Sequence, residues 1–330
     1  MKLGALFLVA IAVAAMSTIA AAAEAPLVLE AKIPLGAVSG RIDHFAIDLA
    51  HRRLFVAELG NNSVGVIDLT TGTLAHRLSG FDEPQGLGYF APTDTLFVAN
   101  GGDGSLRLYR GSGLAPAGHI ALGKDADNVR IDPAEPRLWV GYGDGALAAL
   151  DAASGKKLTD VPLKAHPESF RFDAAGRRIF VNVPDAREIA IVDPAAGRQI
   201  GAIAAPGARG NFPLALDADA GRILSVFRSP PKMMAFDTTT GRLDGEIDVC
   251  GDADDVSVDA ERRRIYISCG AGAIDVLAPR GKGYERVAHI PTAPGARTSL
   301  FVPELDRLYL AIRASLSGEP AAVWVFRPSP

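Results

Sequence analysis

RRLFVAE at residues 52–58 is the stretch that decides the fold, because versions of it recur along the whole chain. With Leu54 as the anchor, equivalent apolar residues follow at steps of 42, 42, 41, 44, 42 and 43 residues. These anchors are Leu96, Leu138, Ile179, Ile223, Ile265 and Leu308. A nearly constant period of this length indicates seven copies of one supersecondary unit.

Each unit has the pattern of four short strands. In the first unit these are HFAID (44–48), RLFVA (53–57), VGVID (64–68) and TLAHRLSG (73–80). Alternation of apolar and polar residues between Asp- and Gly-rich turns is typical of strands. A four-stranded unit repeated at about 40–50 residues predicts an all-β, seven-bladed β-propeller with antiparallel blades.

The two ends of the chain predict how the ring closes. The last unit stops after its third strand, AAVWVF (321–326), whereas LVLEAKI (27–33) precedes the first unit as an extra strand. Pairing these two segments would complete the last blade and remove two exposed strand edges. Residues 24–330 are therefore expected to form a single domain.

The first 23 residues predict export. Lys2 is followed by an apolar run from Leu3 to Ala15 and then by small residues ending in Ala21-Ala22-Ala23. This is the layout of a signal peptide cleaved after Ala23, whereas a membrane anchor needs about 20 uninterrupted apolar residues. The net charge of -4 and the lack of a basic run argue against nucleic acid as a partner. We expect a periplasmic or secreted monomer that does not insert into a membrane.

The repeat also resembles the YVTN-repeat propellers, the YncE-like family of exported proteins. The stretches that carry the resemblance are RLFVAELGNNSVGVIDLTTG (53–72), LFVANGGDGS (96–105) and RIFVNVPDAREIAIVD (178–193). The resemblance covers essentially the whole chain after residue 23 and implies a seven-bladed propeller. Its motifs specify a blade and not a reaction, so function must be argued from a site.

The start of the innermost strands is expected to carry the chemistry. Counting eleven residues back from each anchor gives a ring of Asp43, Gln85, Asp127, Glu168, Phe212, Asp254 and Arg297 at one mouth of the central channel. Neighbouring positions and loops add His44, Glu58, His166 and Asp255 to this face. The predicted ligand-binding residues are Asp43, His44, Glu58, Asp127, His166, Glu168, Asp254, Asp255 and Arg297.

Carboxylates crowded at a channel mouth need compensation, because like charges repel and a desolvated charge is unfavourable. A divalent cation such as Ca²⁺ would be held by Asp43, Asp127, Glu168 and Asp254. Alternatively, Arg41, Arg297 and Arg313 would pair with the acids, or a wide mouth would leave them hydrated. His44 and His166 belong to distant blades, so a metal shared between them would have to lie near the axis.

Two functional hypotheses remain open at this point. The first is an exported protein that binds a small molecule or a protein at the mouth, without catalysis. The alternative is a metal-dependent hydrolase of the lactonase or esterase kind, in which the cation polarises a carbonyl. The sequence has no G-x-S-x-G motif for a serine hydrolase, and without C-x-x-C-H it has no covalent haem site.

Cys250 and Cys269, the two cysteines of the chain, are predicted to form a disulfide. Simple hairpin pairing around residues 260–263 would place Asp254 opposite Cys269, with Cys250 on the same face. Closing this loop would stabilise the fold by about 3 kcal/mol. It would also hold in place the loop that carries Asp252, Asp254 and Asp255.

Overall fold

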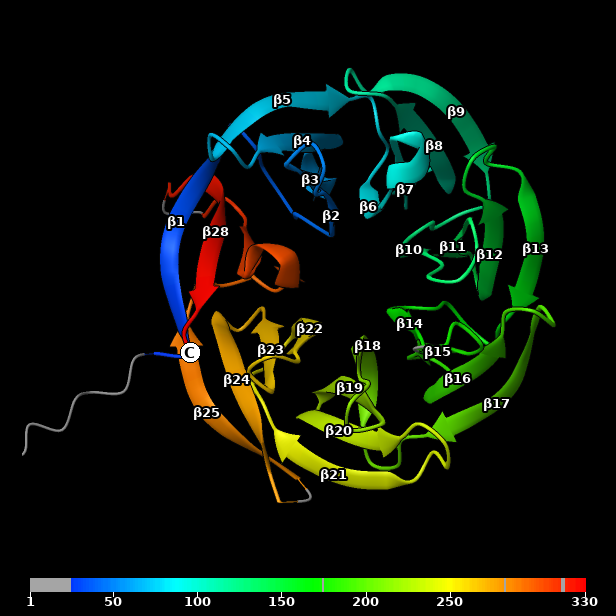
Figure 1. Ribbon diagram of the computed structural model, residues 1–330, viewed down its shortest axis with the longest axis vertical. Helices are drawn as coiled ribbons and strands as arrows, with labels where there is room; N and C mark the ends of the chain where they lie inside the picture. Colours follow the sequence, from blue (N-terminus) through cyan, green and yellow to red (C-terminus); the bar gives the residue numbers. More distant parts are fainter. Residues whose placement is uncertain (1–24, 174, 282, 316–317) are drawn as a thin grey trace, which may run out of the picture.

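The computed structural model describes residues 25–173, 175–281, 283–315 and 318–330. Within these residues the chain forms seven four-stranded antiparallel sheets, arranged as blades around a central channel (Figure 1). The predicted signal peptide, residues 1–23, lies outside the described residues. No helix in the described part of the chain has the length and apolar character needed to cross a membrane.

The strands follow the order expected from the repeat. Blades one to three contain β2 (Phe45–Asp48), β3 (Arg53–Glu58), β4 (Ser63–Asp68), β5 (Thr73–Ser79), β6 (Pro84–Phe90), β7 (Thr95–Asn100), β8 (Ser105–Arg110), β9 (Ala115–Ala121), β10 (Val129–Ile131), β11 (Arg137–Tyr142), β12 (Ala146–Asp151) and β13 (Lys157–Pro162). Blades four to six contain β14 (Phe170–Phe172), β15 (Ile179–Val183), β16 (Glu188–Asp193), β17 (Arg198–Ala204), β18 (Arg209–Asp217), β19 (Arg222–Ser229), β20 (Pro231–Asp237), β21 (Leu243–Asp248), β22 (Ala253–Asp259), β23 (Arg264–Cys269), β24 (Ala273–Arg280) and β25 (Gly283–Pro291). Short 3-10 turns occur at Leu59–Asn61, Ala91–Thr93 and Pro303–Leu305.

Blade seven closes the ring in the predicted way. It contains β26 (Ser299–Val302), β27 (Arg307–Ile312), β28 (Ala321–Pro328) and the N-terminal β1 (Leu27–Gly36). β1 pairs antiparallel with β28, and Ile33 lies opposite Val323. The two ends of the described chain therefore lie in one sheet, where β1 and β28 run side by side (Figure 1).

The core consists of seven hydrophobic clusters, one between each pair of neighbouring blades, among the residues that the structure describes. All seven anchor residues of the repeat are at most 2 % exposed. Burying a Leu or Ile side chain contributes about 1.5–3 kcal/mol, so the anchors hold adjacent blades together. Because the apolar contacts lie between the sheets, the side chains that face the channel are free to be polar.

Candidate functional site

A β-bulge at the start of the innermost strand turns two successive side chains toward the channel. In blade one, the Asp43 N–H donates to the Ala57 carbonyl at 2.7 Å, and the Ala57 N–H donates to the His44 carbonyl at 3.0 Å. Two residues therefore face one, which defines a bulge. The same pattern joins Asp127 and Asn128 to Gly141, and Glu168 and Ser169 to Asn182. Regular alternation would direct only one residue of each pair into the channel.

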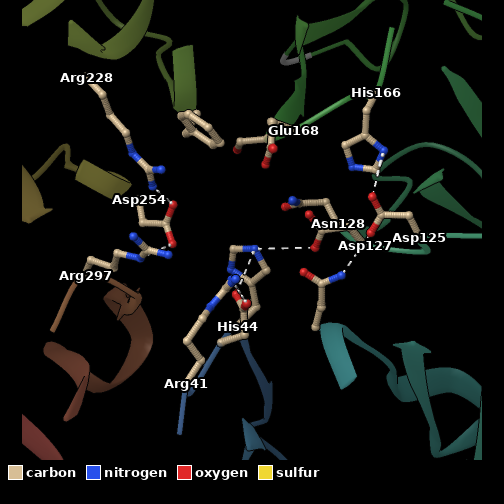
Figure 2. A pocket seen from close by; sticks show the side chains of 14 residues that line it. Arg41, His44, Asp125, Asp127, Asn128, His166, Glu168, Arg228, Asp254 and Arg297 are labelled. Atoms are coloured by element: carbon tan, nitrogen blue, oxygen red, sulfur yellow. Dashed lines mark hydrogen bonds and ion pairs between the residues drawn. The ribbon is translucent and has the colours of Figure 1, made fainter. Parts of the chain in front are cut away.

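These side chains line a cavity of about 180 Å³ at the channel mouth (Figure 2). All seven residues of the predicted ring border it, together with Arg41, His44, Asp125, Asn128, His166, Ser169 and Arg228. The cavity thus brings together the sequence-based candidates Asp43, His44, Asp127, His166, Glu168, Asp254 and Arg297. Glu58 and Asp255 do not border it.

One side of the cavity is acidic, and its carboxylates have no lysine or arginine partner among the described residues, although Asp125 lies 3.6 Å from His166 Nδ1. Asp127 is 7 % exposed, and its Oδ1 atom has no hydrogen-bond partner. Glu168 forms no ion pair with any residue that the structure describes. Asp125 accepts a hydrogen bond from Gln85 Nε2 at 3.2 Å, and His166 Nδ1 lies 2.7 Å from the Gly143 carbonyl. We call Asp125, Asp127 and Glu168 the acidic side.

Asp127 and Glu168 hold protons more tightly than free carboxylic acids do. Burial raises the pKa of Asp127 well above its ordinary range, and the nearby Glu168 carboxylate raises it further. Burial likewise raises the pKa of Glu168 to about 8, with Asp254 and Asp43 adding to the shift and Arg228 opposing it. Two carboxylates that share a desolvated site favour a bound proton or a bound cation.

His44 forms the floor of the cavity. Its Nε2 atom lies 3.7 Å from Asp43 Oδ1 and 3.9 Å from Asp127 Oδ1, and its Nδ1 atom lies 3.9 Å from Asp255 Oδ2. Burial lowers the pKa of His44 to about 3, and the Arg130 guanidinium lowers it further. The imidazole is therefore neutral at physiological pH and does not compensate the charge of Asp127.

The opposite side of the cavity carries arginines that are paired with carboxylates. Arg228 Nη2 lies 2.5 Å from Asp254 Oδ1, and Arg297 lies 3.1 Å from the other oxygen of Asp254 and 2.9 Å from Asp252. Arg41 pairs with Asp43 at 2.6 Å. Burial raises the pKa of Asp43 and of Asp254, and the neighbouring guanidinium groups oppose this shift. We call Arg41, Arg228 and Arg297, with their partners, the arginine side.

The prediction that Glu58 lies at the mouth was wrong. Its side chain lies inside blade one, where its Oε2 atom accepts hydrogen bonds from Arg77 Nε and Ser63 Oγ, each at 2.5 Å. Glu58 is 0 % exposed, as are Asn100, Val183 and Cys269, which occupy the equivalent position in other blades. Side chains at this position point into the protein core. The ion pair between Glu58 and Arg77 therefore stabilises blade one and does not contribute to the mouth.

Asp255 lies below the mouth and not on it. It accepts a hydrogen bond from the Ser299 N–H at 2.8 Å and borders a second cavity of about 230 Å³ together with His44 and Arg130. Burial raises the pKa of Asp255 to about 7, although the Ser299 hydrogen bond opposes the shift. His44 thus separates the mouth cavity from the channel beneath it.

Arg228 and Asp125 border the mouth although they were not among the predicted ligand-binding residues. Arg228 lies near the end of β19, the second strand of blade five, and its guanidinium lies 3.7 Å from the centre of the Phe212 ring. Asp125 stands two positions before the ring residue Asp127. Its backbone takes the left-handed conformation, with φ of 48°. The position of both residues relative to the repeat predicts that they lie on this face of the propeller.

The four candidate metal ligands do not fit a single ion in this conformation. In the described part of the chain, one group of acidic or histidine side chains brings three ligand atoms within 4.8 Å of one another, and it consists of Asp48, His51 and Asp94. That group lies at the other end of the blade, where Arg53 already bridges the two aspartates at 2.6 and 2.7 Å. The mouth carboxylates Asp43, Asp127, Glu168 and Asp254 do not converge in this way.

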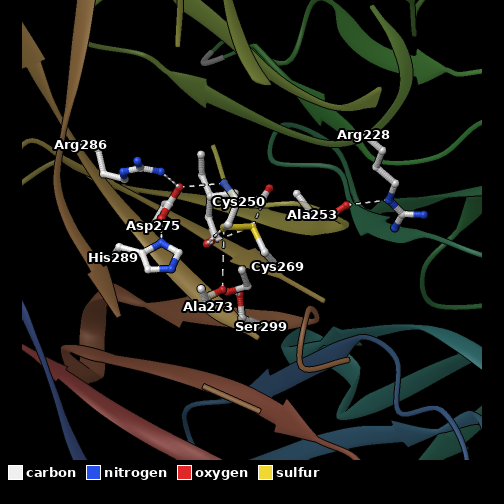
Figure 3. The surroundings of a disulfide bond; sticks show 11 residues. Arg228, Cys250, Ala253, Cys269, Ala273, Asp275, Arg286, His289 and Ser299 are labelled. Atoms are coloured by element: carbon white, nitrogen blue, oxygen red, sulfur yellow. Dashed lines mark hydrogen bonds and ion pairs between the residues drawn. A yellow bond between two sulfur atoms is a disulfide. The ribbon is translucent and has the colours of Figure 1, made fainter. Parts of the chain in front are cut away.

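Cys250 and Cys269 form a disulfide, as the sequence predicted, with their Cα atoms 5.8 Å apart (Figure 3). The simple register holds from Asp255 to Asp259 and slips by one residue at the bulge, so that Ala253 and not Asp254 lies opposite Cys269. The disulfide adjoins the arginine side, since Arg228 Nε donates to the Ala253 carbonyl at 3.0 Å. It therefore secures the backbone that presents Asp252 and Asp254.

Comparison with known proteins supports the fold and a distant relationship. No family model matches this sequence. A solved structure, the hydrazine synthase of Kuenenia stuttgartiensis, superposes with a TM-score of 0.74 over 87 % of this chain and 97 % of that chain. The two sequences are 14 % identical, so this likeness concerns the fold alone.

Among curated proteins, the uncharacterized protein YncE of Salmonella typhi and that of Salmonella typhimurium are each 27 % identical to this chain over 178 residues. The match covers 48 % of this chain and 50 % of each relative, so the chain spans about half the length of the curated relatives it matches. The chain is a seven-bladed β-propeller with distant similarity to YncE.

Proposed function

We propose that the protein binds a small ligand through a cationic group, which the acidic side of the mouth cavity receives. The observation that carries this proposal is Asp127, which lines the cavity and whose Oδ1 atom is buried without a hydrogen-bond partner among the described residues. A buried acceptor without a donor is unfavourable by about 1–3 kcal/mol, and a ligand N–H group would satisfy it. Glu168, its neighbour, offers a second acceptor to the same group.

An organic ammonium group fits the cavity better than a bare metal ion does. The cavity measures about 180 Å³, several times the share of about 30 Å³ that one water takes in the liquid. Ca²⁺ would need six to eight oxygen ligands at about 2.3–2.6 Å, and the mouth carboxylates do not converge on one point. A binding function is therefore better supported than a metal-dependent lactonase or esterase.

We propose that this binding takes place in the periplasm or outside the cell, which the N-terminal sequence pattern supports. We propose a monomer that meets its ligand there, with no role for nucleic acid. A protein partner that offers a lysine side chain to the mouth would use the same chemistry.

Calorimetric titration with propylamine and pentylamine tests the proposal. The wild-type protein is expected to bind at least one amine, and Asp127→Asn is expected to lose that binding because the variant removes the charge of the orphan acceptor. Asp219→Asn serves as the control, since Asp219 is exposed at the opposite end of the propeller. Failure of the wild-type protein to bind either amine, or equal binding by Asp127→Asn, would contradict the proposal.

A further inference from the structure

A side pocket opens from the arginine side of the mouth. It has a volume of about 170 Å³ and lies where blades six, seven and one meet. Arg41 and Arg297 border both this pocket and the mouth cavity, so the two spaces adjoin. Its remaining lining residues are Ile42, Asp252, Gly270, Pro294, Gly295, Ala311 and Arg313. We refer to it as the arginine pocket.

The arginine pocket has more cationic than anionic groups. Three guanidinium groups line it, those of Arg41, Arg297 and Arg313, against the single carboxylate of Asp252. Arg297 and Arg41 are paired, the former with Asp252 and the latter with an aspartate outside the pocket. Arg313 is exposed and has no hydrogen bond or ion pair with any residue of the described chain. The pocket therefore retains one guanidinium whose donors are free.

A glycine makes the position of Arg313 possible. Gly295 has φ of 81°, and a Cβ atom built on it would collide with the Nε and Nη2 atoms of Arg313. The guanidinium thus lies across the glycine at the wall of the pocket. A planar guanidinium presents two parallel N–H groups that match the two oxygens of a carboxylate or a phosphate.

The mouth cavity and the arginine pocket carry unpaired groups of opposite charge. The acidic side carries Asp127 and Glu168 without a cation, and the arginine pocket carries Arg313 without an anion. We infer that the ligand is zwitterionic: its ammonium group meets Asp127 and Glu168, and its carboxylate or phosphate group enters the arginine pocket beside Arg313. This inference rests on the proposed function, because it adds a second contact to the ligand whose cationic group the mouth receives.

Two matched series of probes test the inference and measure the distance between the two subsites. The zwitterions are glycine, β-alanine, γ-aminobutyrate and ε-aminocaproate. The matched amines, each of which lacks only the carboxylate group, are methylamine, ethylamine, propylamine and pentylamine. Calorimetry is expected to find one zwitterion that binds at least about tenfold more tightly than its amine, which corresponds to one charge-assisted contact. Arg313→Met is expected to reduce this preference to about onefold, with the affinity for the amine unchanged.

Arg177→Met is the matched control, since Arg177 is an exposed arginine in a turn at the opposite end of the propeller. This variant should keep the full preference for the zwitterion. If every zwitterion binds no more tightly than its amine, the arginine pocket receives no anionic group, and the amine site stands without it. If Arg313→Met keeps the preference, Arg313 does not hold the anion, and the inference is wrong. If neither series binds, the proposed function fails, and the inference fails with it.

Comparison of phosphoethanolamine with γ-aminobutyrate, which has the same number of bonds between its nitrogen and its anionic centre, separates the two anionic groups. Tighter binding of the phosphate compound assigns the pocket to phosphate, and weaker binding assigns it to a carboxylate. Either result supports the inference only when Arg313→Met removes the difference in affinity between the phosphate compound and the carboxylate compound.

Discussion

Glu168→Gln is expected to stabilise the protein, and the gain should grow with pH. Glu168 has a pKa of about 8 in the folded protein against an ordinary value of 4.5. The folded state therefore keeps a proton between these pH values that the unfolded state has lost, so the stability of the wild type falls as pH rises from about 4.5 to about 8. At 1.36 kcal/mol per pKa unit the full effect at pH 7 would be about 3 kcal/mol. Because the carboxylate borders a water-accessible cavity, we expect a gain of about 1–2 kcal/mol.

Urea unfolding of the wild type and of Glu168→Gln at pH 5, 7 and 9 measures this gain, with tryptophan fluorescence as the signal. The two proteins should have similar stability at pH 5, and the variant should be the more stable at pH 7 and most of all at pH 9. Glu261→Gln is the control, because Glu261 is an exposed glutamate at the opposite end of the propeller. A difference that stays constant with pH, or a variant that is less stable at pH 9, would refute the account of a desolvated and uncompensated Glu168.

Three further changes test other parts of the structure. Asp127→Asn should raise the free energy of unfolding at pH 8 more than Asp254→Asn does, because Arg228 and Arg297 offset part of the cost of burying the Asp254 carboxylate. Urea unfolding measures both variants, and equal effects would contradict the assignment of Asp127 as unpaired and Asp254 as paired. Replacing Cys250 and Cys269 together with Ser should lower stability by about 3 kcal/mol, measured under non-reducing conditions, and an unchanged transition midpoint would show that the disulfide does not stabilise the fold. Ile33→Ala in β1 should lower stability by about 2–4 kcal/mol through a cavity beside β28, and no loss would mean that pairing of β1 with β28 does not hold the ring closed.

The sequence was sufficient to predict the blades because their apolar anchors are buried in every repeat. Leu54 and its six equivalents lie in the second strand of successive blades, and no insertion interrupts their spacing by more than a few residues. The ring at the mouth could also be predicted from the sequence. A bulge recurs at the start of the innermost strand, so the number of residues between the ring position and the anchor is the same in each blade. The offset of eleven residues thus located Asp127 and Asp254 without knowledge of the bulge itself.

The pairing of Arg41 and Arg297 with acids of the mouth agrees with one alternative from the sequence. The pairing of Arg228 was not predicted, because it depends on side-chain placement across blades. Arg228 comes from blade five and pairs with Asp254 of blade six, a contact that no local pattern encodes. Glu58 illustrates the opposite error, since its polarity suggested the mouth although its position in the repeat indicated the core. Val183 and Phe227, its equivalents, are apolar and buried, and comparison of the blades at this position would have corrected the prediction.

The composition of the ring itself argues that its unpaired acids serve a ligand and not the fold. At the same position of the repeat, blade two carries Gln85 and blade five carries Phe212, and both form the same bulge without a charge. The backbone therefore does not require a carboxylate at Asp127 or Glu168, and each is less favourable there than a neutral residue would be. Groups that lower stability are found where activity depends on them. The double variant Asp127→Asn, Glu168→Gln should consequently fold to a more stable propeller that no longer binds amines. A double variant that is less stable than the wild type at pH 8 would instead assign these acids to the fold.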